Sequence, residues 1–250
     1  MPHDKNHAAP ASARNWPWLL VIGLLLAALV VVSFLIDGPV TEWMGKQRSN
    51  TPWKQFATFC TTAGDWPPLA ISAIVGIVIA RFFRARRPAM ILVLMIGSTI
   101  VAGVIVNPLR MATGRARPSA KTQLGWHGLR KDGEWIAGRH RFSAFPSAHT
   151  TVAAAFFTTL VLLGGRRWLP AWSAVIAIGW SRMYLMAHHP SDVMVGAILG
   201  SSCAWFVCRA PGIRWWAWRF ASALCGYRRL WPRWDHGGKL LLGGPAARGV

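Results

Sequence analysis

The chain alternates long apolar segments with short basic and polar ones. The first apolar segment, residues 18–36, contains no charged side chain, and in a helix it would extend about 28 Å, close to the thickness of a bilayer's hydrocarbon core. Five more segments show the same character: residues 68–83, 89–107, 149–164, 170–187 and 191–208. Several are short or carry polar residues, as expected of helices that end at a site or line one. The pattern predicts an all-α, polytopic membrane bundle of about six transmembrane helices.

A cleaved signal peptide is the alternative interpretation of the first apolar segment. Its apolar stretch is longer than the usual signal core, and the following Asp37-Gly38-Pro39 offers no small-residue cleavage site. We therefore expect this segment to remain in the protein as a transmembrane helix.

The composition agrees with a membrane protein. The chain is 53% hydrophobic and only 14% charged, which is too apolar for an ordinary soluble domain of 250 residues. A net charge of +20 could also indicate nucleic-acid binding, but an arginine excess beside membrane helices needs no such partner. The cysteines, Cys60, Cys203, Cys208 and Cys225, lack the spacing of a metal site. We expect no nucleic-acid partner and no metal or other cofactor.

Basic clusters indicate the orientation in the membrane. Residues 81–87 hold four arginines, the loop 164–169 is basic, and the tail after residue 208 is rich in arginine. If six helices alternate in direction, these clusters share one side with the N-terminus, and the positive-inside tendency makes that side cytoplasmic. The segments 37–67 and 108–148 are then outside, in what we expect to be a bacterial cytoplasmic (inner) membrane with the site on its periplasmic face.

One membrane domain accounts for most of the chain. It is predicted to span residues 18–208, preceded by a disordered cytoplasmic segment, 1–17, and followed by a cytoplasmic tail, 209–250. Basic and aromatic residues interleave at the start of the tail, which is typical of an interfacial helix on an anionic leaflet.

The outer segment 108–148 is more basic than its expected side allows. It holds eight Lys and Arg residues against Asp132 and Glu134, and binding a phosphate ester would account for such an excess. Most of these cations are expected to face solvent or lipid headgroups: Arg115, Lys121, Arg130, Lys131, Arg139 and Arg141.

The stretch from Ser181 to Asp192 carries the most informative chemistry. Ser181-Arg182 is followed by His188 and, four residues later, by Asp192. On a continuous helix the last two would share a face, so that Asp192 could hold one ring nitrogen and leave the other free to attack. Because Pro190 should end the helix, we expect this contact to come from a turn.

Two further blocks lie upstream. Arg110 precedes Arg117-Pro118, and Pro146-Ser147-Ala148-His149 opens an apolar segment. Ser147 is expected to cap that helix, whose first free N–H groups would face an anion. Because antiparallel neighbours place their ends in one layer, the three blocks should meet at the outer face.

Together the blocks resemble the tripartite signature of the phosphatidic acid phosphatase type 2 superfamily, which also contains the vanadium haloperoxidases. That signature reads Lys-x6-Arg-Pro, Pro-Ser-Gly-His and Ser-Arg-x5-His-x3-Asp. The third block matches at every defined position, whereas Arg110 replaces the family's Lys and Ala148 replaces its Gly. The resemblance extends over about residues 68–208.

The resemblance implies a metal-independent phosphatase. In such an enzyme His188 would attack phosphorus and form a phosphohistidine, Asp192 would orient it, and His149 would protonate the leaving oxygen and then activate water. The expected phosphate-binding residues are Arg110, Arg117, Ser147, Ala148, Ser181 and Arg182. The chain is therefore expected to hydrolyse a lipid-linked phosphate or diphosphate.

Four substrate classes fit this expectation: undecaprenyl diphosphate, phosphatidylglycerol phosphate, phosphatidic acid and lipid A phosphates. Two alternatives remain from the sequence. One is a vanadate-dependent haloperoxidase-like enzyme, and the other is a non-catalytic lipid-binding protein of the same fold.

Overall fold

The computed structural model describes residues 16–49, 51–120, 124–227, 233–234 and 240–241. The expected N-terminal segment lies outside the described residues except for its last two residues, which begin the first helix. Most of the expected tail beyond residue 227 also lies outside them.

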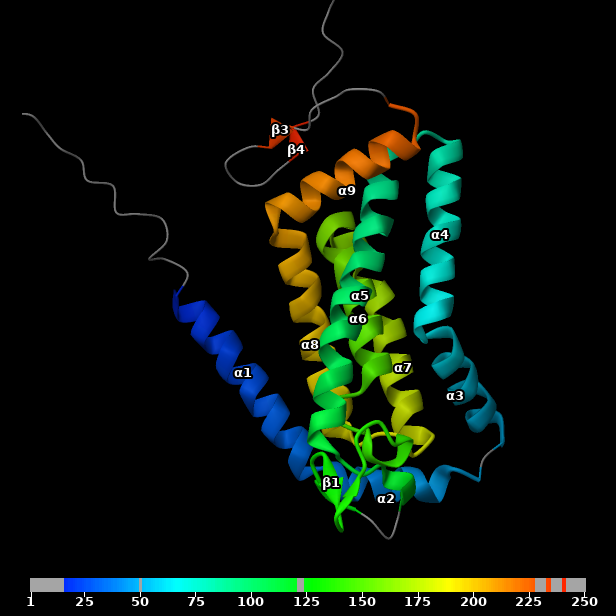
Figure 1. The fold of residues 1–250 in the computed structure, drawn as a ribbon, viewed down its shortest axis with the longest axis vertical. Coiled ribbons are helices and arrows are strands. Elements are labelled where there is room, and N and C mark those ends of the chain that lie inside the picture. The colour runs from blue at the N-terminus through cyan, green and yellow to red at the C-terminus, as the bar shows by residue number, and fades with distance from the viewer. Residues whose placement is uncertain (1–15, 50, 121–123, 228–232, 235–239, 242–250) are drawn as a thin grey trace, which may run out of the picture.

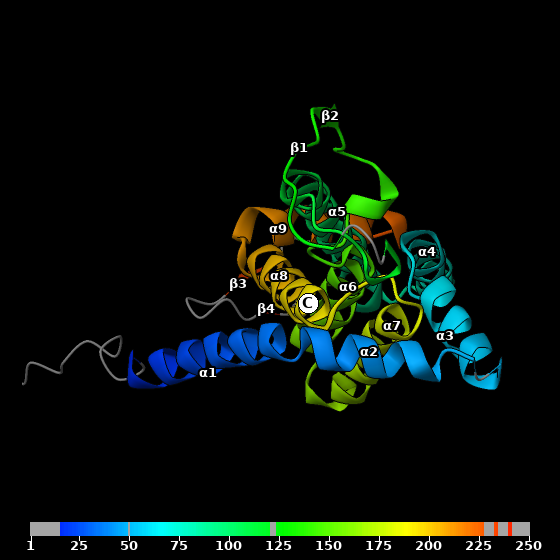
Figure 2. The same cartoon turned by 90° about the horizontal axis from the view of Figure 1, so that it is seen from below.

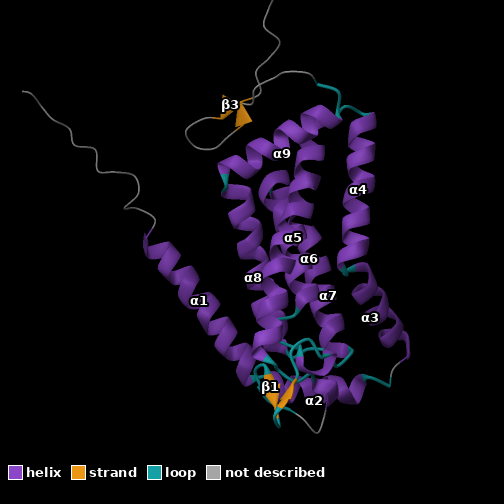
Figure 3. Ribbon diagram, viewed as in Figure 1, coloured by secondary structure: helices purple, strands orange, loops and turns teal. Residues whose placement is uncertain are grey.

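Helices dominate the described part of the chain (Figure 3). In order they are α1 (Trp16–Leu35), α2 (Asp37–Gln47), α3 (Thr51–Ala63), α4 (Trp66–Phe82), α5 (Arg86–Thr113), α6 (Ala148–Gly164), α7 (Trp172–Tyr184), α8 (Pro190–Arg209) and α9 (Pro211–Leu224). Short 3-10 helices lie at Pro118–Ala120, His140–Phe142 and Arg166–Ala171. Strands β1 (Arg130–Lys131) and β2 (Glu134–Trp135) pair antiparallel, as do β3 (Arg233–Trp234) and β4 (Leu240–Leu241).

All six expected apolar segments are helical, as α1 and α4 to α8. The outer segment 37–67, expected only to connect two helices, forms α2 and α3. By length and composition α5 and α8 can each cross a membrane, and up to four crossings result if the bent pairs α1–α2 and α3–α4 each count as one. The fold is an all-α, polytopic membrane helical bundle.

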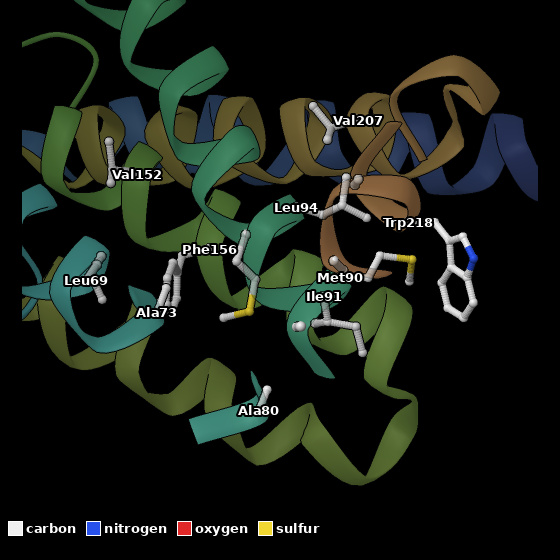
Figure 4. Close-up of a cluster of buried hydrophobic side chains, with 14 of the residues drawn as sticks. Leu69, Ala73, Ala80, Met90, Ile91, Leu94, Val152, Phe156, Val207 and Trp218 are labelled. Atoms are coloured by element: carbon white, nitrogen blue, oxygen red, sulfur yellow. The ribbon is translucent and has the colours of Figure 1, made fainter. Parts of the chain in front are cut away.

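Helices α5, α6 and α8 form the centre of the bundle (Figure 1). Leu94, Phe156 and Val207, one from each of these helices, belong to its largest buried cluster (Figure 4). Trp218 of α9 closes the same cluster where α9 crosses one end of the bundle. The expected tail helix therefore exists, and its position at a membrane surface stays a prediction.

Two glycines bring α8 into close contact with α6. A Cβ atom added at Gly200 would lie 2.1 Å from the carbonyl oxygen of Thr151, and one added at Gly196 would lie 2.8 Å from that of Ser147. Small residues spaced by four allow membrane helices to approach backbone to backbone. This packing brings the N-terminus of α6 beside the N-terminal part of α8.

The end of the bundle opposite α9 gathers the chemistry-bearing segments. The C-terminus of α5, the N-terminus of α6, the turn between α7 and α8, and the β1–β2 hairpin all lie at this end, with α2 running beneath them (Figures 1 and 2). The three sequence blocks therefore converge at one end of the bundle.

Candidate active site

His188 lies in the turn between α7 and α8. Helix α7 ends at Tyr184 and α8 begins at Pro190, so the helix does break before the proline. The side chain is 2% exposed, and its Nδ1 atom lies 2.7 Å from the carbonyl oxygen of Ala144. A carbonyl only accepts hydrogen bonds, so Nδ1 carries the proton and Nε2 keeps a free lone pair.

Asp192 holds the turn and lies beside the imidazole of His188. Its Oδ2 atom accepts the backbone N–H of His189 at 2.7 Å, whereas the distance from Oδ2 to Nδ1 of His188 is 3.6 Å. The shorter contact of Nδ1 is with the carbonyl oxygen of Ala144, and the expectation that Asp192 orients His188 stays a prediction. Asp192 lies at the third position of α8 and fixes the backbone that carries His188.

Three arginines gather near His188. Arg117 and Arg182 are buried, and their Nε atoms have no hydrogen-bond partner among the described residues. The Nη2 atom of Arg110 donates to Ser143 at 2.9 Å. None of the three forms an ion pair within 4.0 Å in the described part of the chain, which leaves their charges available to an anion.

The arginine charges act on one another and on the nearby histidines. Burial, followed by the charges of Arg182 and Arg110, lowers the pKa of Arg117 to about 10, so Arg117 stays cationic at neutral pH. Burial and the charges of Arg182 and Arg117 hold the pKa of His188 well below 6.5. The charge of Arg117, followed by burial, also lowers the pKa of His140. His188 is therefore an uncharged imidazole at neutral pH.

The N-terminus of α6 faces this cluster without the expected side-chain cap. Ser147 is fully buried; its hydroxyl accepts from Thr150 at 3.0 Å and caps no backbone N–H. Its backbone N–H donates to the carbonyl of Asp192 at 3.0 Å, which ties α6 to α8. The helix begins at Ala148, so the N–H groups of its first turn lack intrahelical acceptors and can face an anion.

The hydroxyl of Ser181, which the sequence predicts to bind phosphate, has hydrogen-bond partners within the protein. Its hydroxyl donates to the carbonyl of Ile178 at 2.7 Å and lies 2.8 Å from the hydroxyl of Thr61 on α3. The side chain is fully buried. In this structure Ser181 links α7 to α3, and Arg182 beside it supplies the charge.

His149, the second residue of α6, borders a cavity. Its Nε2 atom is 3.5 Å from Oδ1 of Asp65. The cavity, of about 490 Å³, lies between α4, α5 and α6. Its polar lining includes Asp65, Thr99, Asn107, Arg110 and His149, and its apolar lining includes Ile100, Val104, Val106 and Val152. The lining of the cavity therefore combines charged side chains with apolar ones.

Arg115 is the residue that the sequence interpretation missed most clearly. It was expected in a solvated or headgroup-facing loop, but it is buried and lies 2.6 Å from carboxylate oxygens of both Asp37 and Asp192. Its guanidinium also lies 4.7 Å from the ring centroid of Trp126. Asp37, at the bend between α1 and α2, additionally accepts the backbone N–H of Ser191 at 2.9 Å. No local pattern marks this pairing, because its partners are more than 70 residues apart.

The site and the fold define a class of membrane phosphate-binding protein, and the sequence comparisons identify it. The sequence model of the PAP2 superfamily matches residues 88–216, about half of the chain, and the protein belongs to that superfamily. The resemblance drawn from the three blocks is confirmed.

The chain is similar to two curated groups of relatives. It is 28% identical over 201 residues to a lipid A 1-phosphatase of Rhizobium johnstonii, covering 76% of this chain and 78% of the relative. It is 26% identical over 158 residues to a lipid A 4'-phosphatase of Bacteroides thetaiotaomicron, covering 61% of this chain and 67% of the relative.

Two solved structures share the fold. The crystal structure of Aquifex aeolicus LpxE aligns with a TM-score of 0.53 at 20% identity, covering 70% of this chain and 96% of that one. A transmembrane PAP2-type phosphatidylglycerolphosphate phosphatase of Bacillus subtilis aligns with a TM-score of 0.50 at 19% identity, covering 75% and 92%. The apolar helices and these membrane relatives make the chain a membrane protein.

Proposed function

We propose that the protein is a lipid phosphate phosphatase that works through a phosphohistidine. The observation that carries the proposal is the state of His188: a buried, uncharged imidazole whose Nδ1 is held by the carbonyl of Ala144, beside arginines without ion-pair partners among the described residues. A neutral nucleophile within a cationic cluster suits an anionic phosphoryl group.

In the first step the lone pair of His188 Nε2 attacks phosphorus. The N–P bond forms as the bond between phosphorus and the ester oxygen breaks, and His149 gives its proton to the departing oxygen. Arg110, Arg117 and Arg182 balance the charge on the equatorial oxygens, and the free N–H groups at Ala148 donate to them.

In the second step water replaces the histidine. His149 takes a proton from the water, whose oxygen attacks phosphorus, and the P–N electron pair returns to Nε2 of His188. Inorganic phosphate leaves, and both histidines regain their starting protonation. The proton on Nδ1 stays in its hydrogen bond to Ala144 throughout, so the imidazole keeps one tautomer. The nucleophile and the cations are all side chains of this chain, so we propose that the reaction needs no metal.

The shape of the cavity supports an amphiphilic substrate. Beside Arg110 and His149 its lining includes apolar residues of α5, of which Val104 is 68% exposed. A phosphate at the charged end would leave its hydrocarbon part along this apolar wall. Among the candidate classes we favour a lipid A phosphate, because both groups of curated relatives are lipid A phosphatases.

We further propose that the site opens on the periplasmic side of a bacterial inner membrane, with both termini cytoplasmic. The support is the distribution of arginine: residues 81–87, the loop 164–169 and the start of α9 all lie at the bundle end away from the site.

A panel assay tests the function. Purified protein in detergent micelles is given lipid A, phosphatidic acid, phosphatidylglycerol phosphate and undecaprenyl diphosphate, with excess EDTA present, and inorganic phosphate is measured. We expect release from at least one lipid and, in rapid-quench samples, an acid-labile, base-stable phosphoprotein. His188→Ala should abolish both while remaining folded; unchanged turnover in this variant would refute the nucleophile assignment. Loss of activity in EDTA that Mg²⁺ restores would refute the metal-free mechanism.

A further inference from the structure

We propose that Asp65 is a positioning residue for His149. Its carboxylate lies 3.5 Å from Nε2 of the imidazole and favours the protonated ring, which leaves Nδ1 to exchange the proton with the leaving oxygen. This inference rests on the proposed phosphatase function and adds a residue that lies outside all three sequence blocks.

The first support is geometric. Oδ1 of Asp65 lies 3.5 Å from Nε2 of His149, and both side chains border the cavity that also contains Arg110. The same Oδ1 atom accepts the backbone N–H of Trp66 at 2.8 Å, so the carboxylate also caps α4. A cap restricts the rotamer of Asp65 and keeps the carboxylate directed at His149.

The second support is the anchoring of the corner between α3 and α4. The hydroxyls of Thr61 and Ser181 lie 2.8 Å apart, which fastens the end of α3 to α7. Gly64 packs directly on α7, where an added Cβ atom would lie 2.4 Å from Cδ1 of Ile178. Two contacts with α7, three residues apart on that helix, therefore fix the backbone next to Asp65 even though its side chain is 53% exposed.

The third support is the balance of charge around His149. The guanidinium of Arg110 borders the same cavity as His149, and a nearby cation disfavours a second positive charge. Among the described residues, Asp65 is the carboxylate within 4.0 Å of it. A general acid must carry its proton before the first step, and a carboxylate beside the ring opposes the effect of the arginines.

A leaving-group comparison tests the proposal. The substrates are dodecyl phosphate, whose alkoxide leaves only if it is protonated, and a dodecyl-substituted 4-nitrophenyl phosphate, whose phenolate leaves without that help. For Asp65→Asn we expect kcat with dodecyl phosphate to fall by about 10- to 100-fold, within the range of general acid catalysis, and kcat with the nitrophenyl ester to fall by less than about threefold. A residue with a merely structural role would reduce both rates alike.

Three comparisons keep the test specific. Asparagine caps helices as well as aspartate does, so Asp65→Asn should leave the Tm of the detergent-solubilised protein within a few degrees of the wild-type value. Asp132→Asn removes the same charge from the exposed β1–β2 turn and should change neither kcat. His149→Ala should show the same leaving-group pattern, and adding Asp65→Asn to it should cause little further loss.

The results that would contradict the role of Asp65 differ from the result that would contradict the proposed function. Equal losses on both substrates, an unchanged rate with dodecyl phosphate, or multiplicative losses in the double variant would overturn the role of Asp65. A wild-type protein that hydrolyses neither ester nor any lipid of the panel would instead overturn the proposed function.

Discussion

Arg115 and Asp192 form a buried ion pair, with Nη1 of the arginine 2.6 Å from Oδ1 of the carboxylate. The other Nη atom of Arg115 lies 2.6 Å from Asp37 at the bend between α1 and α2. One arginine thus connects the first two helices to the residue that holds the turn of His188.

Replacing Arg115 with methionine should destabilise the protein strongly. The change keeps the apolar contacts but leaves two buried carboxylates facing each other, which costs about 3–5 kcal/mol when one partner of a buried pair is removed. Thermal unfolding in detergent measures this loss, and phosphate release should fall with it because Asp192 loses its anchor. Arg139→Met removes an exposed pair with Glu134 and should cost less than about 1 kcal/mol. Equal Tm values for the two variants would contradict this account.

Adding a methyl group at Gly200 should separate α8 from α6. The new Cβ atom would lie 2.1 Å from the carbonyl oxygen of Thr151, so the backbones must move apart, at a cost of about 1–3 kcal/mol. Because the same contact aligns the N-terminus of α6 with α8, kcat should fall together with Tm. Gly97→Ala is the matched control, since its Cβ atom would meet nothing within 4 Å. A fully active Gly200→Ala protein would show that this approach is not needed.

Activity should persist below pH 6.5. The pKa of His188 is lowered by burial and by the charges of Arg182 and Arg117, so lowering the pH to 6.5 leaves Nε2 unprotonated. Protonation at a still lower pH removes the lone pair, and kcat/KM should fall only there. In Arg117→Met one of these charges is gone, the pKa of His188 rises, and the acid limb should move to higher pH. Both profiles are measured with one substrate, so its own titration is common to them; coincident limbs would argue against the assignment.

Filling the cavity between α4 and α5 should distinguish lipid substrates from small ones. Gly103 borders this cavity, and a Cβ atom there would meet nothing within 4 Å, so Gly103→Phe can enter it without a backbone clash. We expect KM for a lipid phosphate to rise by about tenfold, the loss of one to two kcal/mol of apolar contact, and hydrolysis of 4-nitrophenyl phosphate to change little. Gly97→Phe, on the same helix but away from the cavity, is the control. Equal effects on both substrates would show that the chain does not lie in this cavity.

The sequence by itself was sufficient for the six apolar helices, though not for α2 and α3, and for the meeting of the three blocks. Runs of apolar residues long enough to cross a bilayer must form helices there, because the backbone has no other hydrogen-bond partners in lipid. Once the six apolar segments alternate in direction, Arg117, Ser147 and His188 are expected at one end of the bundle without any knowledge of packing. The break before α8 was also predictable, because Pro190 cannot continue a helix.

Only the tertiary structure decided which atoms hold these side chains. The partner of His188 is a backbone carbonyl, at Ala144, and every residue has such a carbonyl, so no side-chain pattern could indicate it. The pairing of Arg115 with Asp37 joins positions far apart in the chain, and the contact of Asp65 with His149 depends on how closely Gly64 packs on α7. Local periodicity governs helix formation, whereas long-range ion pairs and ring orientations depend on the distances between packed helices, which a single sequence does not contain.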